Sequence, residues 1–148
     1  MTDPIFVDTN VLIYVRDDRN ALKREQARVW LSALADLGRV RTNLQVLNEL
    51  TRWILKNEPG RSLQEIREDI EVIGAWGAKP IDHDDTERAW HVRRTYGFQW
   101  FDCLLIAAAC NLGCTAFLTE DMTHGTAFEG MTIINPFRVE LDDLIKRN

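Results

Sequence analysis

The order of elements along the chain predicts an α/β fold built on a central parallel sheet. Short apolar runs, which are typical of buried strands, alternate with longer segments whose apolar residues recur at helical spacing. Parallel neighbours need a crossover long enough to return to the starting edge, and the helices supply it. We therefore predict four or five short strands with helices on both faces. With 148 residues the chain has the size of one domain, and we expect residues 1–148 to form a single unit.

The first strand and the first long helix are predicted close to the N-terminus. Ile5–Val7 is a short apolar run followed by the polar triplet Asp8-Thr9-Asn10, which predicts a buried strand that ends in a turn. From Asn20 to about Leu37 apolar residues fall at mostly helical spacing, and Gly38 suits the position just after a helix.

A second strand and two further helices are predicted next. Val40–Thr42 is a brief strand, and Asn43 is suited to cap a helix whose apolar residues line one face. Ser62 and Glu65 have the spacing of a capping box, so another helix begins there and runs to about Trp76.

The C-terminal half continues the alternation. Lys79–Ile81 is predicted as a very short strand, and Asp84 or Asp85 opens a helix that ends at Gly97. An alanine-rich helix is predicted over Trp100–Leu112, with Gly113 as its stop. The last predicted elements are strands over Thr115–Leu118 and Met131–Ile134.

Charge and composition restrict the class of function. The formal net charge of −5 has the wrong sign for a protein that coats nucleic acid nonspecifically. The longest apolar run, Cys103–Cys110, is too short to cross a membrane, and the first residues lack an export signal, so we expect a cytoplasmic protein. The three cysteines include no CxxC pair and are predicted to be small buried side chains.

Four carboxylates are predicted to meet beyond the carboxyl ends of the strands, where open α/β sheets bind ligands. Asp8 directly follows the first strand, and Asp121 follows a later one. Asp102 lies in the first turn of the alanine-rich helix, and Glu49 lies about two turns into an earlier helix. Each acid alone is also explained as a cap or a solvated position. Asp8, Glu49 and Asp102 nevertheless occur among apolar residues, where burial is expected.

Carboxylates gathered in this way need a counter-charge. Two of them 4 Å apart repel by about 4 kcal/mol at an effective dielectric constant of 20. No lysine lies near any of the four in the sequence. Mg²⁺ prefers oxygen ligands and keeps several waters, and Mn²⁺ would fit similarly. Because a metal-held water has a lowered pKa and can attack phosphorus, Asp8, Glu49, Asp102 and Asp121 predict a hydrolytic metal site.

Four sequence blocks also carry a family resemblance. They are Asp8-Thr9-Asn10, Glu49 near residue fifty, Trp100-Phe101-Asp102 before an apolar run, and Thr119-Glu120-Asp121-Met122, with a closing Ile134-Asn135-Pro136-Phe137. In this order and spacing they resemble the PIN-domain family, and within it the VapC-type ribonuclease toxins of bacterial toxin–antitoxin pairs. The resemblance covers nearly the whole chain.

The resemblance implies magnesium- or manganese-dependent cleavage of RNA by an endoribonuclease. It assigns Asp8, Glu49 and Asp102 to the acidic core and Asp121 to a more variable fourth position. It also implies a homodimer and a cognate antitoxin protein. The neighbouring Glu120 is the less favoured candidate for the fourth acid, and whether it or His124 takes part stays open.

The expected mechanism divides the roles among the acids. Asp8 and Asp102 would hold the principal ion, Glu49 would orient or deprotonate a water, and Asp121 would help to hold a second ion or the scissile phosphate. Thr9 and Thr119 are candidates to hydrogen-bond these carboxylates. Water as the nucleophile implies 5′-phosphate and 3′-hydroxyl products. Basic residues near the first two helices and at the end of a later one are candidates to steer RNA, namely Arg16, Arg19, Lys23, Arg24, Arg28, Arg93 and Arg94.

Three alternatives stay open. A housekeeping RNA-processing nuclease of the PIN type would share the same four acids. A non-catalytic PIN-like binding module is disfavoured because no acid is missing. Phosphoaspartate enzymes, such as haloacid-dehalogenase-like phosphatases, also place acids at this edge, but they need DxD after the first strand, where this chain has Asn10, and a lysine that we cannot place.

Overall fold

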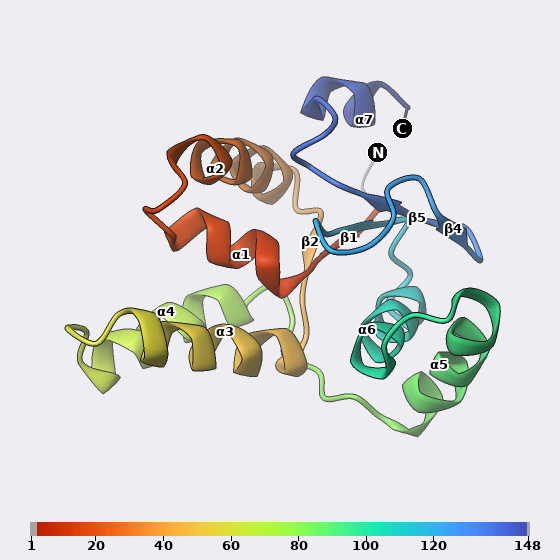
Figure 1. Ribbon diagram of the computed structural model, residues 1–148, viewed down its shortest axis with the longest axis horizontal. Coiled ribbons are helices and arrows are strands. Elements are labelled where there is room, and N and C mark those ends of the chain that lie inside the picture. Colours follow the sequence, from red (N-terminus) through yellow and green to blue (C-terminus); the bar gives the residue numbers. More distant parts are fainter. Residues whose placement is uncertain (1–2, 148) are drawn as a thin grey trace.

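One five-stranded sheet forms the centre of the molecule (Figure 1). The computed structural model describes residues 3–147, with side chains for residues 3–144. The strands are β1 (Ile5–Val7), β2 (Val40–Arg41), β3 (Ala116–Leu118), β4 (Ala127–Phe128) and β5 (Met131–Ile134). Their order is β2-β1-β3-β5-β4, with parallel pairing throughout except between β4 and β5. The α/β fold class is confirmed, and β4 adds an antiparallel edge that the sequence analysis did not predict.

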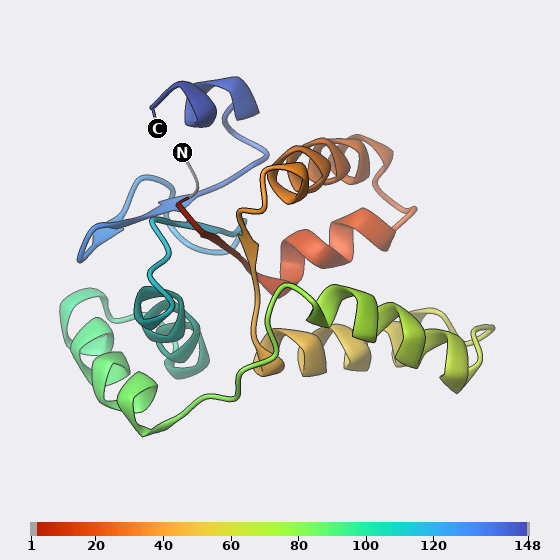
Figure 2. The same ribbon diagram turned by 180° about the vertical axis from the view of Figure 1, so that it is seen from behind.

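Helices cover both faces of this sheet, as predicted. They are α1 (Thr9–Arg16), α2 (Ala21–Asp36), α3 (Leu44–Asn57), α4 (Leu63–Gly74), α5 (His83–Tyr96), α6 (Trp100–Asn111) and α7 (Leu141–Arg147). Helices α2 and α7 lie on the opposite side of the sheet from α5 and α6 (Figures 1 and 2). Helix α1 packs against α2 and α3, and α3 packs against α4. In the described part of the chain, none of the helices has the length and apolar character that a bilayer crossing requires.

Most predicted helix ends are confirmed by their capping bonds. The side chains of Asn20 and Asn43 cap α2 and α3, and Ser62 with Glu65 forms the expected capping box of α4. Gly97 ends α5 in the left-handed conformation. The start of α5 was misplaced: Asp82 is the capping residue, so the helix begins before Asp84.

The predicted turn after β1 is instead the start of α1. Asp8 caps this helix, and its Oδ1 accepts a hydrogen bond from the Thr9 amide at 2.7 Å. The helix has only eight residues, several of them β-branched or polar, so its sequence carries a weak helical signal. Its buried Val11 and Leu12 join the core.

The strand predicted over Lys79–Ile81 is absent, because this segment runs outside the sheet. It is nevertheless tied to the end of β2. The Thr42 amide donates to the Trp76 carbonyl at 3.2 Å, and the Leu44 amide donates to the Lys79 carbonyl at 3.0 Å. Gly77 lies between these bonds with φ of +135°, and a Cβ there would meet the Thr42 oxygen at 2.4 Å. The path from α4 to α5 therefore requires glycine at this position.

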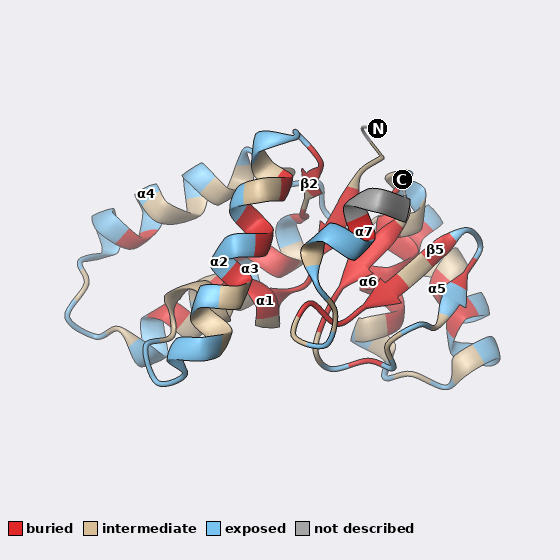
Figure 3. Ribbon diagram, turned by 90° about the horizontal axis from the view of Figure 1, so that it is seen from above, coloured by how far each residue is buried: buried red, intermediate tan, exposed pale blue. Residues whose placement is uncertain are grey.

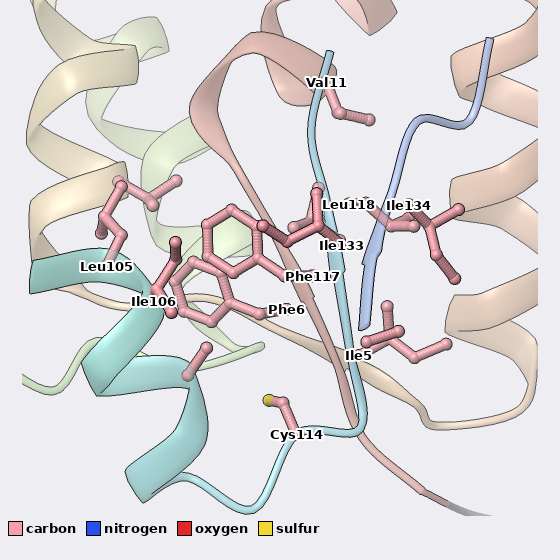
Figure 4. Close-up of a cluster of buried hydrophobic side chains, with 14 of the residues drawn as sticks. Ile5, Phe6, Val11, Leu105, Ile106, Cys114, Phe117, Leu118, Ile133 and Ile134 are labelled. Carbon is pink, nitrogen blue, oxygen red and sulfur yellow. The ribbon is translucent and has the colours of Figure 1, made fainter. Parts of the chain in front are cut away.

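The core is built on the two faces of the central strands. All three residues of β1 are fully buried. The rings of Phe6 and Phe117 stack with centroids 5.2 Å apart, and they face Leu105 and Ile106 of α6 (Figure 4). In Figure 3 the buried residues accordingly gather along the sheet and α6. Cys103 and Cys114 are buried, as predicted, whereas Cys110 is only partly buried.

We expect Gly77→Ala to destabilise the protein by about 2 kcal/mol or more, since it adds both a clash and a strained backbone. Urea unfolding would measure the change. Gly60→Ala is the matched control, because Gly60 has open space around it and no left-handed φ. Equal stabilities of the two variants would contradict the close approach of Gly77 to β2.

Candidate active site

A cleft of about 510 Å³ opens beyond the carboxyl ends of β1 and β3, and all four predicted acids border it. They come from separate stretches of chain: Asp8 after β1, Glu49 in α3, Asp102 in α6 and Asp121 after β3. The rest of the wall consists of Thr9, Asn10, Ile13, Arg52, Trp53, Lys56 and Asn57. The topology therefore brings together the residues that the sequence pattern had singled out.

Asp8 is the most deeply placed of the four carboxylates, with only 5% of its surface exposed. Its Oδ2 accepts hydrogen bonds from the Thr119 hydroxyl at 2.9 Å and from the Asn10 amide at 3.1 Å. Burial raises the pKa of Asp8 to about 7. Hydrogen bonds from Thr119 and from the Thr9 backbone oppose this rise, whereas the charges of Asp102 and Glu49 add to it.

Asn10 joins the two strand ends, a role that the sequence analysis missed. Its Nδ2 lies 3.1 Å from Asp8 Oδ2, 2.9 Å from the Thr119 hydroxyl and 3.1 Å from Asp121 Oδ2. Its Oδ1 accepts from the Glu120 amide at 3.0 Å. The only signal for this role was its place two residues after Asp8.

Glu49 reaches the cleft from α3 with both carboxylate oxygens held. The Thr9 hydroxyl donates to Oε2 at 2.5 Å, and the Gln45 side-chain amide donates to Oε1 at 3.1 Å. Two fixed donors restrict the rotamer of a long, flexible acid. Glu49 is therefore presented to the cleft in one orientation.

Asp102 lies in the first turn of α6 and is half-buried. Within residues 3–144 its carboxylate accepts no hydrogen bond and forms no salt bridge. Burial raises the pKa of Asp102, and the nearby charges of Asp121 and Glu49 raise it further. The same group of acids thus acts electrostatically on both Asp8 and Asp102.

The neighbours Glu120 and Asp121 lie in different surroundings. Glu120 accepts a hydrogen bond from the Tyr14 hydroxyl at 2.6 Å and pairs with Lys23. Burial alone would raise the pKa of Glu120, but the hydrogen bonds from Lys23 and Tyr14 outweigh it and hold that pKa below its usual value. Asp121 borders the cleft instead. His124 does not border it and accepts a hydrogen bond from the Asn135 amide.

The cations at the cleft are not those that the sequence analysis favoured. Arg16 pairs with Glu58 and Asp69, and Lys23 pairs with Glu120. Arg52 and Lys56 border the cleft, and in the described part of the chain neither forms a salt bridge. Their positions three and seven residues after Glu49 on α3 were the available signal.

Comparison with known proteins identifies the family. The family model of the PIN domain matches residues 5–124. The chain belongs to the PIN domain family. A search of the curated proteins found no significant match.

Solved structures share the fold of this PIN domain at low sequence identity. A toxin–antitoxin complex from Klebsiella pneumoniae has a TM-score of 0.68 at 18% identity, covering 93% of this chain and 100% of that one. VapBC2 from Rickettsia felis, bound to a promoter DNA fragment, has a TM-score of 0.60 at 12% identity, covering 87% and 96%. VapC20 from Mycobacterium tuberculosis, a toxin that cleaves the sarcin–ricin loop, has a TM-score of 0.55 at 18% identity, covering 76% and 86%.

The donor set of the PIN domain fits a hydrated divalent cation. In residues 3–144 no three His, Cys, Asp or Glu side chains stand close enough to form a ready-made cage. Mg²⁺ does not need one, since it keeps several waters and binds through one or two carboxylates together with substrate phosphate. Four carboxylate side chains border the cleft, and none is paired with a described cation. Burial and the neighbouring carboxylates raise the pKa values of Asp8 and Asp102, and a bound cation would favour the ionised forms of both.

In a metal-free buffer with EDTA, we expect the free energy of unfolding to fall by about 1 kcal/mol per pH unit between pH 5 and 7. The pKa of Asp8 is about 7 in the folded protein, against 3.8 ordinarily. The folded state therefore binds more protons than the unfolded state in this window, and stability is lost as the pH rises. The slope halves near pH 7 and vanishes above about pH 8, where Asp8 is ionised in both states.

Urea unfolding at a series of pH values would measure this slope. In Asp8→Asn the slope should be clearly smaller, because only the weaker contribution of Asp102 remains. A wild-type stability that does not change from pH 5 to 7 would contradict the described burial of Asp8.

Proposed function

We propose that this PIN domain is a metal-dependent endoribonuclease and the toxin of a toxin–antitoxin pair. The observation that carries the proposal is the meeting of Asp8, Glu49, Asp102 and Asp121 in one cleft without a paired cation. Family membership supports nuclease chemistry. The toxin role is supported by the structural neighbours, of which one is a toxin–antitoxin complex and another a toxin that cleaves the sarcin–ricin loop.

In this proposal Asp8 and Asp102 would hold the principal ion, and Asp121 would help to hold a second ion or lie next to the scissile phosphate. A bound Mg²⁺ or Mn²⁺ would supply an activated water and stabilise negative charge on phosphate oxygens. Glu49, held by Thr9 and Gln45, is oriented to accept a proton from that water.

Other residues of the cleft fit RNA binding and positioning. Arg52 and Lys56 are free to contact phosphates of the RNA on either side of the cut. Asn10 keeps Asp8 and Asp121 at a fixed separation. The proposal also includes a cognate antitoxin protein, which the toxin–antitoxin complexes among the neighbours support. It further includes a homodimer and a cytoplasmic location.

The decisive experiment is cleavage of total RNA by the purified protein with Mg²⁺, with Mn²⁺ and with EDTA. We expect cleavage only with the metals and ends that carry 5′-phosphate and 3′-hydroxyl groups. Asp8→Asn and Asp102→Asn should each lower the rate at least about 100-fold. Cyclic 2′,3′-phosphate ends, or full activity in EDTA, would refute the mechanism.

The adjacent acids after β3 offer a matched control. Asp121→Asn should lower the rate about 10-fold, because it alters the metal surroundings. Glu120→Gln makes the same chemical change one residue away, where the side chain faces Lys23 and Tyr14, and should leave the rate nearly unchanged. If Glu120→Gln lowered the rate more than Asp121→Asn, Glu120 would be the fourth acid of the site in place of Asp121.

The toxin role is tested by induced expression in bacteria. We expect growth arrest with the wild-type protein and none with Asp8→Asn produced in equal amount. Arrest that persists in Asp8→Asn would argue against nuclease-based toxicity. Cleavage of RNA in vitro without any arrest would instead favour an RNA-processing nuclease.

A further inference from the structure

A second hollow of about 380 Å³ adjoins the acidic cleft along α3. Glu49 and Arg52 border both spaces, so a ligand that occupies one reaches the edge of the other. The remaining wall consists of Leu44, Gln45, Asn48, Pro80 and Ile81. None of these five borders the acidic cleft, and the mechanism above uses only Gln45 among them, as a donor to Glu49.

The two walls of this hollow are tied together by the backbone. The Leu44 amide at the start of α3 donates to the Lys79 carbonyl, directly before Pro80. The approach of Gly77 to the Thr42 oxygen holds the same segment close to the end of β2. The hollow is therefore formed by the fold itself and needs no ligand to assemble it.

Its lining combines apolar surface with two side-chain amides. Leu44, Pro80 and Ile81 supply the apolar part. Asn48 is exposed, and its side chain makes no hydrogen bond to any residue of the described chain. Gln45 uses its Nε2 on Glu49, which leaves its Oε1 available as an acceptor. Apolar surface beside amide donors and acceptors suits a nucleobase, which has apolar faces and a polar edge.

The position of the amides on α3 relates this hollow to the cleavage chemistry. Asn48 and Arg52 are four residues apart, as are Gln45 and Glu49, so each amide lies about one helical turn, a rise of about 6 Å, from a residue of the acidic cleft. A phosphate near Arg52 would thus have its base, or the adjacent base, within reach of Asn48. The hollow contains a single cation, which suits a base better than a second phosphate.

We propose that this hollow binds an unstacked base next to the scissile phosphate, and that Asn48, assisted by Gln45, determines which base is preferred. The inference rests on the proposed ribonuclease function and adds the specificity of that same site. Single-stranded or looped RNA is the substrate class that it implies, because bases within a duplex cannot turn outward into a side pocket.

The test is cleavage of a short single-stranded RNA pool with randomised bases, followed by sequencing of the new 5′ ends. We expect the wild type to prefer one base at a position flanking the cut. Asn48→Ala should reduce that preference about 10-fold, the scale of a lost base contact, while cleavage itself continues. Asn48→Asp, which replaces amide donors by acceptors, should move the preference to another base. Gln64→Ala, an exposed amide on α4, is the matched control and should keep the wild-type preference.

A binding measurement separates failure of this inference from failure of the nuclease proposal. Fluorescence anisotropy with labelled rA, rC, rG and rU oligomers of equal length is measured for Asp8→Asn and for Asp8→Asn/Asn48→Ala. We expect unequal affinities in the first protein and more nearly equal ones in the second. If these affinities were found but the wild-type protein did not cleave RNA, the nuclease proposal would be overturned and the base site would be retained.

Two results would overturn the base site. The first is a wild-type cleavage preference that Asn48→Ala retains, which would keep the nuclease and leave the hollow to another ligand, such as a segment of a protein partner. The second is equal affinity for all four oligomers in Asp8→Asn together with no preference at the cut.

Discussion

The site depends on the burial of Asp8 at the end of β1, the fully buried strand that is paired on both sides. Strand β1 has neighbours on both sides in the sheet and is fully buried, so Asp8 is held where water is scarce and other carboxylates are near. Hydrogen bonds from Thr119, Asn10 and the Thr9 amide offset part of the penalty, but they bring no positive charge. The hydrogen bonds therefore stabilise the ionised form of Asp8 only in part, and a bound cation would stabilise it further.

The loop after β3 shows how one stretch of chain can serve both stability and chemistry. Glu120 is neutralised by Lys23 of α2 and held by Tyr14 of α1, so it anchors the loop to these two helices. This ion pair holds Lys23 beside Glu120. Lys23 does not border the cleft. Asp121, one residue later, borders the cleft and accepts a hydrogen bond from the side-chain amide of Asn10.

Sequence reasoning succeeded where a local pattern has one physical solution. The capping box of Ser62 and Glu65, the left-handed Gly97 and the apolar run of β1 each specify their own structure. It failed where the outcome depends on distant residues. Helix α1 is stabilised by its packing on α2 and α3, and the segment near Lys79 pairs with the end of β2 outside the sheet. The acids could be placed because strand ends converge, whereas the roles of Asn10, Arg52 and Lys56 needed the relative positions of α1, α3 and the β3 loop.

The periodicity of helix α3 places residues of the proposed catalytic site and of the proposed base site on one helix. Its residues Val46, Leu50 and Ile54 are buried in the core, which fixes the rotation of the helix about its axis. With that rotation set, the polar positions fall in order along the other face: the amides of Gln45 and Asn48, the carboxylate of Glu49 and the cation of Arg52. A change that rotated α3 would displace all of them together. If the proposed base site is occupied, the base and the scissile phosphate would be bound about one helical turn apart on α3, and one binding event would both select the base and align the phosphate.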